Sequence, residues 1–224
     1  MDKKIGIKTY SLDEIKEYIS ENRNKKVEAK IKLEDAILLL LSAIEYRKVI
    51  ISRTLLMKEV FLFYEEILKP LKVSEGAKEV GYIAYKFGPY SYKVNIAVAS
   101  LILSGKVQYK NYYENKEKLD NILPETMNEE KFLALYETTE NFYDIVGKYN
   151  SILKRIHIKP DSLRERIADK KLRWDQRGAM GIIRYVYSRY KEYIVNSSLK
   201  EVYPDLFYGI IKEDRWLNDR NRKY

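Results

Sequence analysis

The sequence predicts a mostly α-helical fold with a few short strands, and three observations support this prediction. Apolar residues recur every three or four positions in several segments, as they do along the buried face of a helix. Capping residues and Gly or Pro stop signals bound these segments. Hydrophobic residues make up 46% of the 224 positions, which is ample for a packed core.

The stretch from Gly81 to Tyr109 carries the clearest pattern. A short apolar strand, Tyr82–Lys86, leads through a Gly-Pro turn into a helix at Ser91–Ser104, and a second strand follows at Val107–Tyr112. The proline lacks an amide hydrogen and keeps the residue before it out of the α region, while the serine after it can cap the new helix. This order is typical of a winged helix-turn-helix domain, which we expect over residues 1–120.

Four earlier segments complete that expected domain. Ser11–Ser20 reads as a short helix with a capping box, and Leu33–Tyr46 as a helix that is apolar on nearly all sides and therefore buried. Val49–Ile51 is a candidate first strand. The helix Arg53–Leu68 follows, with a serine before it as its cap.

The helix Ser91–Ser104 presents polar groups at its N-terminus. Tyr92, Lys93 and Asn95 lie opposite its apolar face, where a helix entering the DNA major groove would face the bases. Basic residues on neighbouring elements would then contact phosphates. This expected phosphate-contacting group consists of Arg53, Lys58, Lys106 and Lys110.

Residues 121–224 are expected to form a second, helical domain. From residue 128 to 157, apolar residues alternate at spacings of three and four, interrupted by one threonine, which predicts a long heptad-like helix followed by a C-terminal helical bundle. Its apolar stripe packs either against a second copy of the chain, giving a homodimer, or against the chain's own C-terminal helices. The sequence favours neither alternative.

Basic residues gather toward the two ends of the chain. Residues 1–112 carry 20 basic and 14 acidic groups, residues 113–159 carry 7 and 9, and residues 160–224 carry 15 and 10. The net charge of +9 fits a polyanionic partner such as double-stranded DNA, because each phosphate contact releases a condensed counterion. Such a charge also keeps proteins soluble that bind no nucleic acid, so both interpretations stay open.

The residue inventory excludes several kinds of site. The chain has no cysteine and one histidine, which excludes disulfides, thiolate metal sites and multi-histidine sites. We expect no cofactor, no metal site and no catalytic residue. The N-terminus lacks a signal-peptide core, and the longest apolar run, Ala36–Ile44, is half the length of a membrane span, so we expect a cytoplasmic protein without membrane contact.

One enzyme-like pattern stands against this expectation. Asp161 after a proline, followed by Asp169 and Lys171, matches the two halves of a metal-dependent nuclease motif, in which carboxylates hold Mg²⁺. Such motifs lie on adjacent strands, whereas residues 162–173 read as a helix. We therefore interpret these carboxylates as a helix start and a solvated face.

The segment Ala36–Val107 resembles the archaeal and bacterial winged-helix family typified by YwgA, and more distantly the Panacea antitoxin domains. The likeness rests on the apolar helix AILLLLSAI, the helix beginning RTLLMK, the turn YKFGPYS and the helix end LILSGKV. It implies a winged-helix fold. The recognition helix departs from the family in carrying no acidic residue, which favours contact with DNA.

These observations lead to two functional hypotheses. The first is a DNA-binding winged-helix protein, either a transcriptional regulator or a DNA-organising protein. The composition of the chain, with many Lys, Glu and Ile and two glutamines, is typical of proteins from thermophiles. Together with a similarity in style to proteins of archaeal plasmids and viruses, it suggests a thermophilic archaeon or its plasmid or virus as the source. The second is a protein-interaction module, antitoxin-like or an assembly protein, that uses the winged helix as a scaffold.

Overall fold

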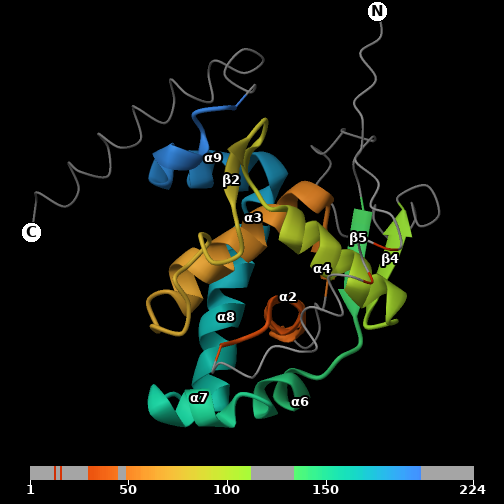
Figure 1. Cartoon of the computed structure of the whole chain (residues 1–224), viewed down its shortest axis with the longest axis vertical. Helices are drawn as coiled ribbons and strands as arrows, with labels where there is room; N and C mark the ends of the chain where they lie inside the picture. The colour runs from red at the N-terminus through yellow and green to blue at the C-terminus, as the bar shows by residue number, and fades with distance from the viewer. Residues whose placement is uncertain (1–12, 14–15, 17–29, 45–48, 112–133, 198–224) are drawn as a thin grey trace, which may run out of the picture.

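The computed structural model describes residues 13, 16, 30–44, 49–111 and 134–197 (Figure 1). Helices predominate among them, which confirms the predicted mostly α-helical class. The helices and helical turns are α2 (Leu33–Ser42), α3 (Arg53–Phe63), the π-helical turn η1 (Tyr64–Leu68), α4 (Tyr92–Leu103), α6 (Phe142–Gly147), α7 (Asn150–Arg155), α8 (Pro160–Asp175), α9 (Gly178–Arg189) and the 3₁₀ turn η3 (Lys191–Tyr193). The strands are β1 (Val49–Ile51), β2 (Ile83–Tyr85), β3 (Gly88–Tyr90), β4 (Val107–Asn111) and β5 (Ala134–Thr138). The predicted helix Ser11–Ser20 falls outside the described residues except at positions 13 and 16.

Helix α2 forms the centre of the core, as its apolar sequence predicts. Its seven residues from Ala36 to Ser42 are at most 2% exposed, because α3, α4, α6 and α8 all pack around it. Its one buried carboxylate, Asp35, is balanced from the α6–α7 corner. Lys148 Nζ lies 3.0 Å from Asp35 Oδ1, and the Tyr149 hydroxyl donates to Asp35 Oδ2 over 2.6 Å. This polar contact fixes the C-terminal half of the chain to α2.

A three-stranded antiparallel sheet lies at one side of the helices, in the order β1-β5-β4 (Figure 1). The last strand in the chain, β5, occupies the middle position. Ile50 of β1 and Tyr109 of β4 both stand opposite Tyr136 of β5. The Thr138 hydroxyl also donates to the Lys106 carbonyl over 2.7 Å, which ties the end of β5 to the start of β4.

The predicted long helix over residues 128–157 is wrong. Its described part divides into β5, α6 and α7. Asn141 marks a new helix start after β5, because its side chain accepts a hydrogen bond from Tyr143 N over 2.8 Å and caps α6. The seam residues of the described part are mostly buried in the chain's own core, namely Leu135, Phe142, Val146, Tyr149 and Leu153. Of the two alternatives left open for the apolar stripe, the homodimer therefore loses the surface on which it depended.

Helices α8 and α9 both pack against α3 (Figure 1). Phe61 of α3 meets three tyrosine rings edge-on, with centroid distances of 5.2 Å to Tyr82, 4.9 Å to Tyr190 and 4.9 Å to Tyr193. Trp174 of α8 is 1% exposed and belongs to the same core. Residues on both sides of the predicted boundary at 120 thus share one hydrophobic core, and β5 pairs with strands from the other side of it.

Candidate nucleic-acid interface

The N-terminus of α4 is held in place by Ser91. Its hydroxyl accepts a hydrogen bond from Val94 N and donates one to the Val80 carbonyl over 2.6 Å, so the predicted cap is confirmed. Val94, Ala97 and Leu101 turn into the core. The opposite side of the first turn is therefore exposed to solvent.

The hairpin formed by β2 and β3 precedes α4 and adjoins its first turn. Ile83 pairs with Tyr90, and Tyr85 with Gly88, so the predicted turn at Gly88–Tyr90 is in fact the second strand of this hairpin. The rings of Tyr85 and Tyr90 lie 5.0 Å apart, and those of Tyr90 and Tyr92 also 5.0 Å apart. Asn95 Nδ2 donates to the Tyr90 hydroxyl. A continuous row of aromatic rings therefore joins the hairpin to α4.

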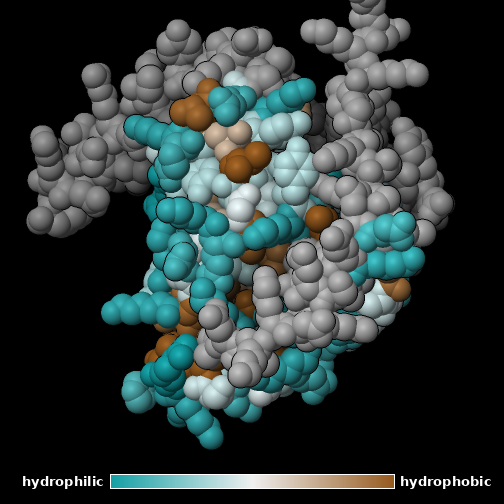
Figure 2. All heavy atoms as spheres, in the orientation of Figure 1, coloured by the Kyte–Doolittle hydropathy of each residue, from teal (hydrophilic) through white to brown (hydrophobic). Residues whose placement is uncertain are grey.

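Several large apolar side chains of this region are exposed rather than buried. Ile83 is 46%, Tyr85 37%, Phe87 51% and Tyr92 37% exposed. Figure 2 shows, in the orientation of Figure 1, apolar side chains among mostly hydrophilic ones. Exposed Lys93 completes this surface, since its aliphatic chain passes close to Gly81 at the start of the hairpin. We call the surface made by Ile83, Tyr85, Phe87, Tyr92 and Lys93 the hairpin face.

The C-terminal elements hold the hairpin from behind. Gly88 has φ +83°, and a Cβ at this position would collide with the ring of buried Tyr187 in α9. Ser197 donates to the Lys86 carbonyl over 3.1 Å, and Asn196 Nδ2 donates to the Ala84 carbonyl over 3.3 Å. The hairpin is thus a supported element with a defined position.

Lys58 is not part of any exposed surface, so its predicted phosphate contact is wrong. Its side chain is 2% exposed and donates to the Pro89 carbonyl of β3 over 2.7 Å. Burial disfavours the charged form and lowers the pKa of Lys58 to about 7. The sequence places Lys58 opposite the apolar stripe of α3, but α3 is covered on more than one side.

The other predicted phosphate-contacting residues lie toward the sheet. Arg53 is exposed at the start of α3, and its charge is close enough to Tyr136 of β5 to act toward a lower pKa of the Tyr136 hydroxyl. Lys106 and Lys110 are half-buried at the end of α4 and on β4, and Lys110 Nζ lies 3.0 Å from Glu137 Oε2. The structure therefore brings Tyr92, Lys93 and Asn95 together and distributes the remaining cations over neighbouring elements.

The apolar residues of the hairpin were not predicted as site residues. One signal in the sequence points to them: residues 80–113 contain no Asp or Glu, although these make up 33 of the 224 residues of the chain. Four lysines occur in the same stretch. The β2–β3 hairpin and α4 therefore contribute positive charge and hydrogen-bonding groups without any carboxylate.

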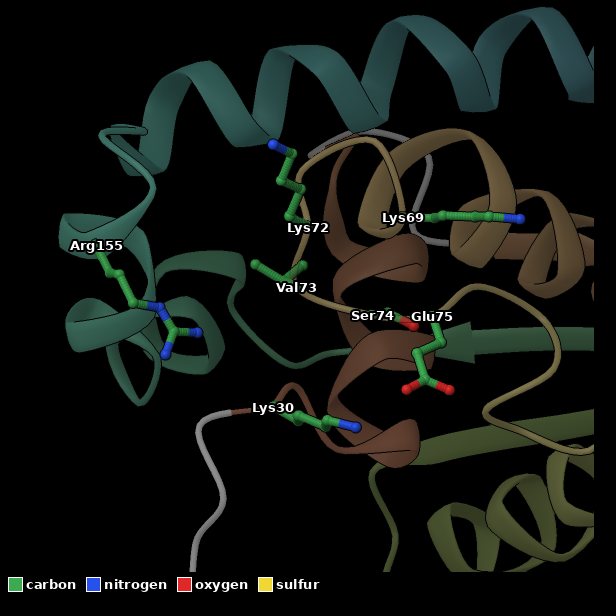
Figure 3. A pocket seen from close by; sticks show the side chains of 7 residues that line it. All are labelled: Lys30, Lys69, Lys72, Val73, Ser74, Glu75 and Arg155. Atoms are coloured by element: carbon green, nitrogen blue, oxygen red, sulfur yellow. The ribbon is translucent and has the colours of Figure 1, made fainter.

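A second candidate is a basic cleft of about 640 Å³ beside α7 (Figure 3). Lys30, Lys69, Lys72 and Arg155 line it, together with Val73, Ser74 and Glu75. Figure 3 shows Arg155 approaching from α7, on the side opposite Ser74 and Glu75, while the Lys69 side chain points away from the space between them.

Two of the lysines that line this cleft are already paired with carboxylates. Lys69 Nζ lies 2.7 Å from Glu65 Oε2, and Lys30 Nζ lies 3.7 Å from Glu79 Oε1. The cleft is therefore a weaker candidate for an anionic ligand than its count of cations suggests.

The residues of the nuclease-like pattern all lie on helix α8. Asp161 accepts a hydrogen bond from the Tyr143 hydroxyl over 2.7 Å, and Asp169 Oδ1 lies 3.0 Å from an Arg173 nitrogen. Lys171 is fully buried. Within the described ranges, no group of three or more His, Asp and Glu residues is placed to hold a metal ion.

Lys171 belongs to a buried ion cluster between α3 and α8, formed with Glu59 and Asp175. Its ammonium lies 2.8 Å from Asp175 Oδ2 and 3.6 Å from Glu59 Oε2. Burial raises the pKa of Glu59 well above its ordinary value, because the charged form is poorly solvated there. The side chains of Lys171 and Glu59 are 0% exposed and that of Asp175 is 3% exposed, so the cluster offers almost no surface to a ligand.

No family model matches this chain, and no curated protein or solved structure is significantly similar to it. The likeness to the family typified by YwgA therefore remains an expectation from its motifs. Among the described residues, no helix combines the length and the apolar character that crossing a bilayer requires.

Proposed function

We propose that this chain binds double-stranded DNA through a winged helix-turn-helix unit formed by α2, β1, α3, α4, β4 and β5. The order of these elements along the chain supports the proposal, as does the sheet order β1-β5-β4, in which the two strands after α4 would form the wing. In this arrangement α4 is the recognition helix.

The proposal rests on the first turn of α4, which is exposed. The segment that contains this turn, residues 80–113, contributes no carboxylate to the surface. Tyr92 and Lys93 are exposed there, and Asn95 is half-buried against Tyr90. Amide and ammonium groups can read base edges in the major groove, while Arg53, Lys106 and Lys110 would contact phosphates on either side. The role we propose is that of a transcriptional regulator or DNA-organising protein of a thermophilic archaeon or one of its plasmids or viruses.

A binding titration against genomic DNA fragments tests this function. The double variant Lys93→Ala/Asn95→Ala should reduce the difference in affinity between preferred and random fragments, because it removes base contacts worth about 1–3 kcal/mol each. Leu103→Ala is a suitable control, since Leu103 is 61% exposed at the other end of α4. Equal affinity of wild type and double variant for every fragment would remove α4 as the recognition helix.

The second candidate is a protein-interaction module, and the exposed apolar residues Ile83 and Phe87 favour it. Salt separates the two functions. Binding to DNA should weaken steeply as salt rises, whereas docking of a protein on an apolar surface should change little.

A further inference from the structure

Two aromatic residues of the hairpin face, Tyr85 and Phe87, lie outside the proposed recognition helix α4. Tyr85 and Phe87 belong to the β2–β3 hairpin, which lies before α4 in the chain, and both rings are more than a third exposed. Exposing such rings to water is unfavourable, by roughly 25 cal/mol for each Å² of apolar surface left unburied. An occupant that covers them would recover this energy.

We propose that Tyr85 and Phe87 stack on unpaired bases, so that the protein prefers DNA at a junction between duplex and single strand. This inference rests on the proposed function, because α4 would hold the duplex while the hairpin contacts the bases next to it. Aromatic side chains accept any base, since every base has a π-face. The preference would therefore be for DNA structure and not for a particular sequence.

The support behind the hairpin favours this role. Tyr187 fills the space beside Gly88, and residues 196 and 197 donate hydrogen bonds to the carbonyls of Ala84 and Lys86. Tyr85 is further held by the ring of Tyr90, which itself accepts a hydrogen bond from Asn95 of α4. Rings that are already positioned lose little conformational freedom when a base stacks on them.

Charge decides between a nucleic acid and an apolar protein as the occupant. Lys86 lies between the two rings in sequence and Lys93 follows them, and the whole stretch 80–113 lacks carboxylates. A phosphate backbone lying beside stacked bases would find cations here and no repulsive acid from this segment. The lack of carboxylates in this stretch gives no such advantage to a neutral protein surface.

Fluorescence anisotropy with the full-length chain tests the proposal. The two probes share one duplex sequence, of which one copy ends blunt and the other continues into an unpaired strand. We expect wild type to bind the junction about tenfold more tightly, and Phe87→Ala or Tyr85→Ala to lose most of this excess while binding the blunt duplex within about twofold of wild type.

Two further variants at Phe87 separate stacking from simple apolar contact. Phe87→Trp keeps a ring and should keep the junction preference, whereas Phe87→Leu keeps an apolar side chain and should lose it. Leu103→Ala should leave both affinities unchanged. A fluorescent base analogue placed in the unpaired strand gives a second measurement, because stacking on Phe87 should quench it and Phe87→Ala should restore its emission.

The outcomes distinguish this inference from the proposed function. Duplex binding that depends on Lys93 and Asn95, combined with equal affinity for the two probes, would overturn the stacking proposal and leave the function standing. Equal retention by Phe87→Leu and Phe87→Trp would also overturn it and would indicate an apolar docking surface for a protein. Absence of binding to either probe would remove the proposed function together with the inference.

Discussion

The hairpin face and the buried ion cluster each contain one lysine, in opposite surroundings. Lys93 stands exposed beside aromatic rings that the protein leaves uncovered, whereas Lys171 is fully enclosed between α3 and α8 with Asp175 2.8 Å from its ammonium. Burial, and not residue type, decides whether a lysine can bind a ligand. Lys58 makes the same point, because it lies on a helix next to Glu59 and contacts a backbone carbonyl instead of a phosphate.

The largest effect should come from breaking the buried ion cluster. Lys171→Met leaves the carboxylate of Asp175 buried without its ion-pair partner, and we expect a loss of about 3–5 kcal/mol in the free energy of unfolding. Chemical denaturation followed by circular dichroism measures this. Arg173→Ala is the matched control on α8, since the Arg173–Asp169 pair is solvated, and it should cost below about 1 kcal/mol. Similar losses for the two variants would contradict the expected difference between a buried and a solvated ion pair.

The next effect depends on pH and concerns Lys58. Its pKa is about 7 in the folded protein and about 10.5 when unfolded, so the unfolded chain binds more protons between these values and stability rises with pH across that window. Below pH 7 the full penalty of charging a buried ammonium applies, which amounts to roughly 5 kcal/mol at most.

Lys58→Met removes this dependence along with the hydrogen bond to Pro89. The difference in stability between variant and wild type should therefore shift in favour of the variant as the pH falls from about 9 to about 6. Denaturation curves across this range measure the shift, and titrations common to both proteins cancel in the difference. A pH-independent difference would show that Lys58 keeps its ordinary pKa.

A smaller effect should follow from disturbing the support of the hairpin. Gly88→Ala adds a Cβ at φ +83° that collides with the Tyr187 ring. We expect a loss of about 2–3 kcal/mol in the free energy of unfolding, measured by thermal denaturation. Gly105→Ala is the control. It has a similar φ of +72° but open space around the added methyl group, so it should cost about 1 kcal/mol. Equal losses would mean that Tyr187 moves aside freely.

The smallest effect on stability should come from Lys110. Its pair with Glu137 is partly exposed, so Lys110→Ala should change the free energy of unfolding by less than about 0.5 kcal/mol. The same variant should weaken binding to all DNA sequences and lower the slope of affinity against salt by about 1. Lys154→Ala, at an exposed position on α7, should change neither quantity.

Local signals predicted much of the N-terminal half. The strand Val49–Ile51 has the predicted bounds, and α4 differs from the predicted helix by one residue at each end. Ser52 and Ser91 cap their helices as expected, accepting hydrogen bonds from Leu55 N and Val94 N. These features depend on residues close together in the chain, which is why the sequence alone reveals them.

Features that depend on distant contacts were missed. The heptad spacing over 128–157 arises because a strand and two short helices each turn apolar residues into one core, and Asn141 interrupts the helix that the spacing predicts. Lys58 looked exposed because the packing of β3 against α3 cannot be read from the sequence of α3. The aromatic row was overlooked because its partners, Tyr85, Tyr90 and Tyr92, meet only once the hairpin is formed.

The position of β5 in the sheet has a consequence for how the chain becomes native. Ile50 of β1 pairs with Tyr136 of β5, which is synthesised 86 residues later. The sheet can therefore form only after most of the chain has been synthesised. A shortened chain that stops after β4 would leave β1 and β4 without the strand that joins them. Dissection into halves should therefore yield fragments prone to aggregation, so tests of the proposed DNA binding need the intact polypeptide.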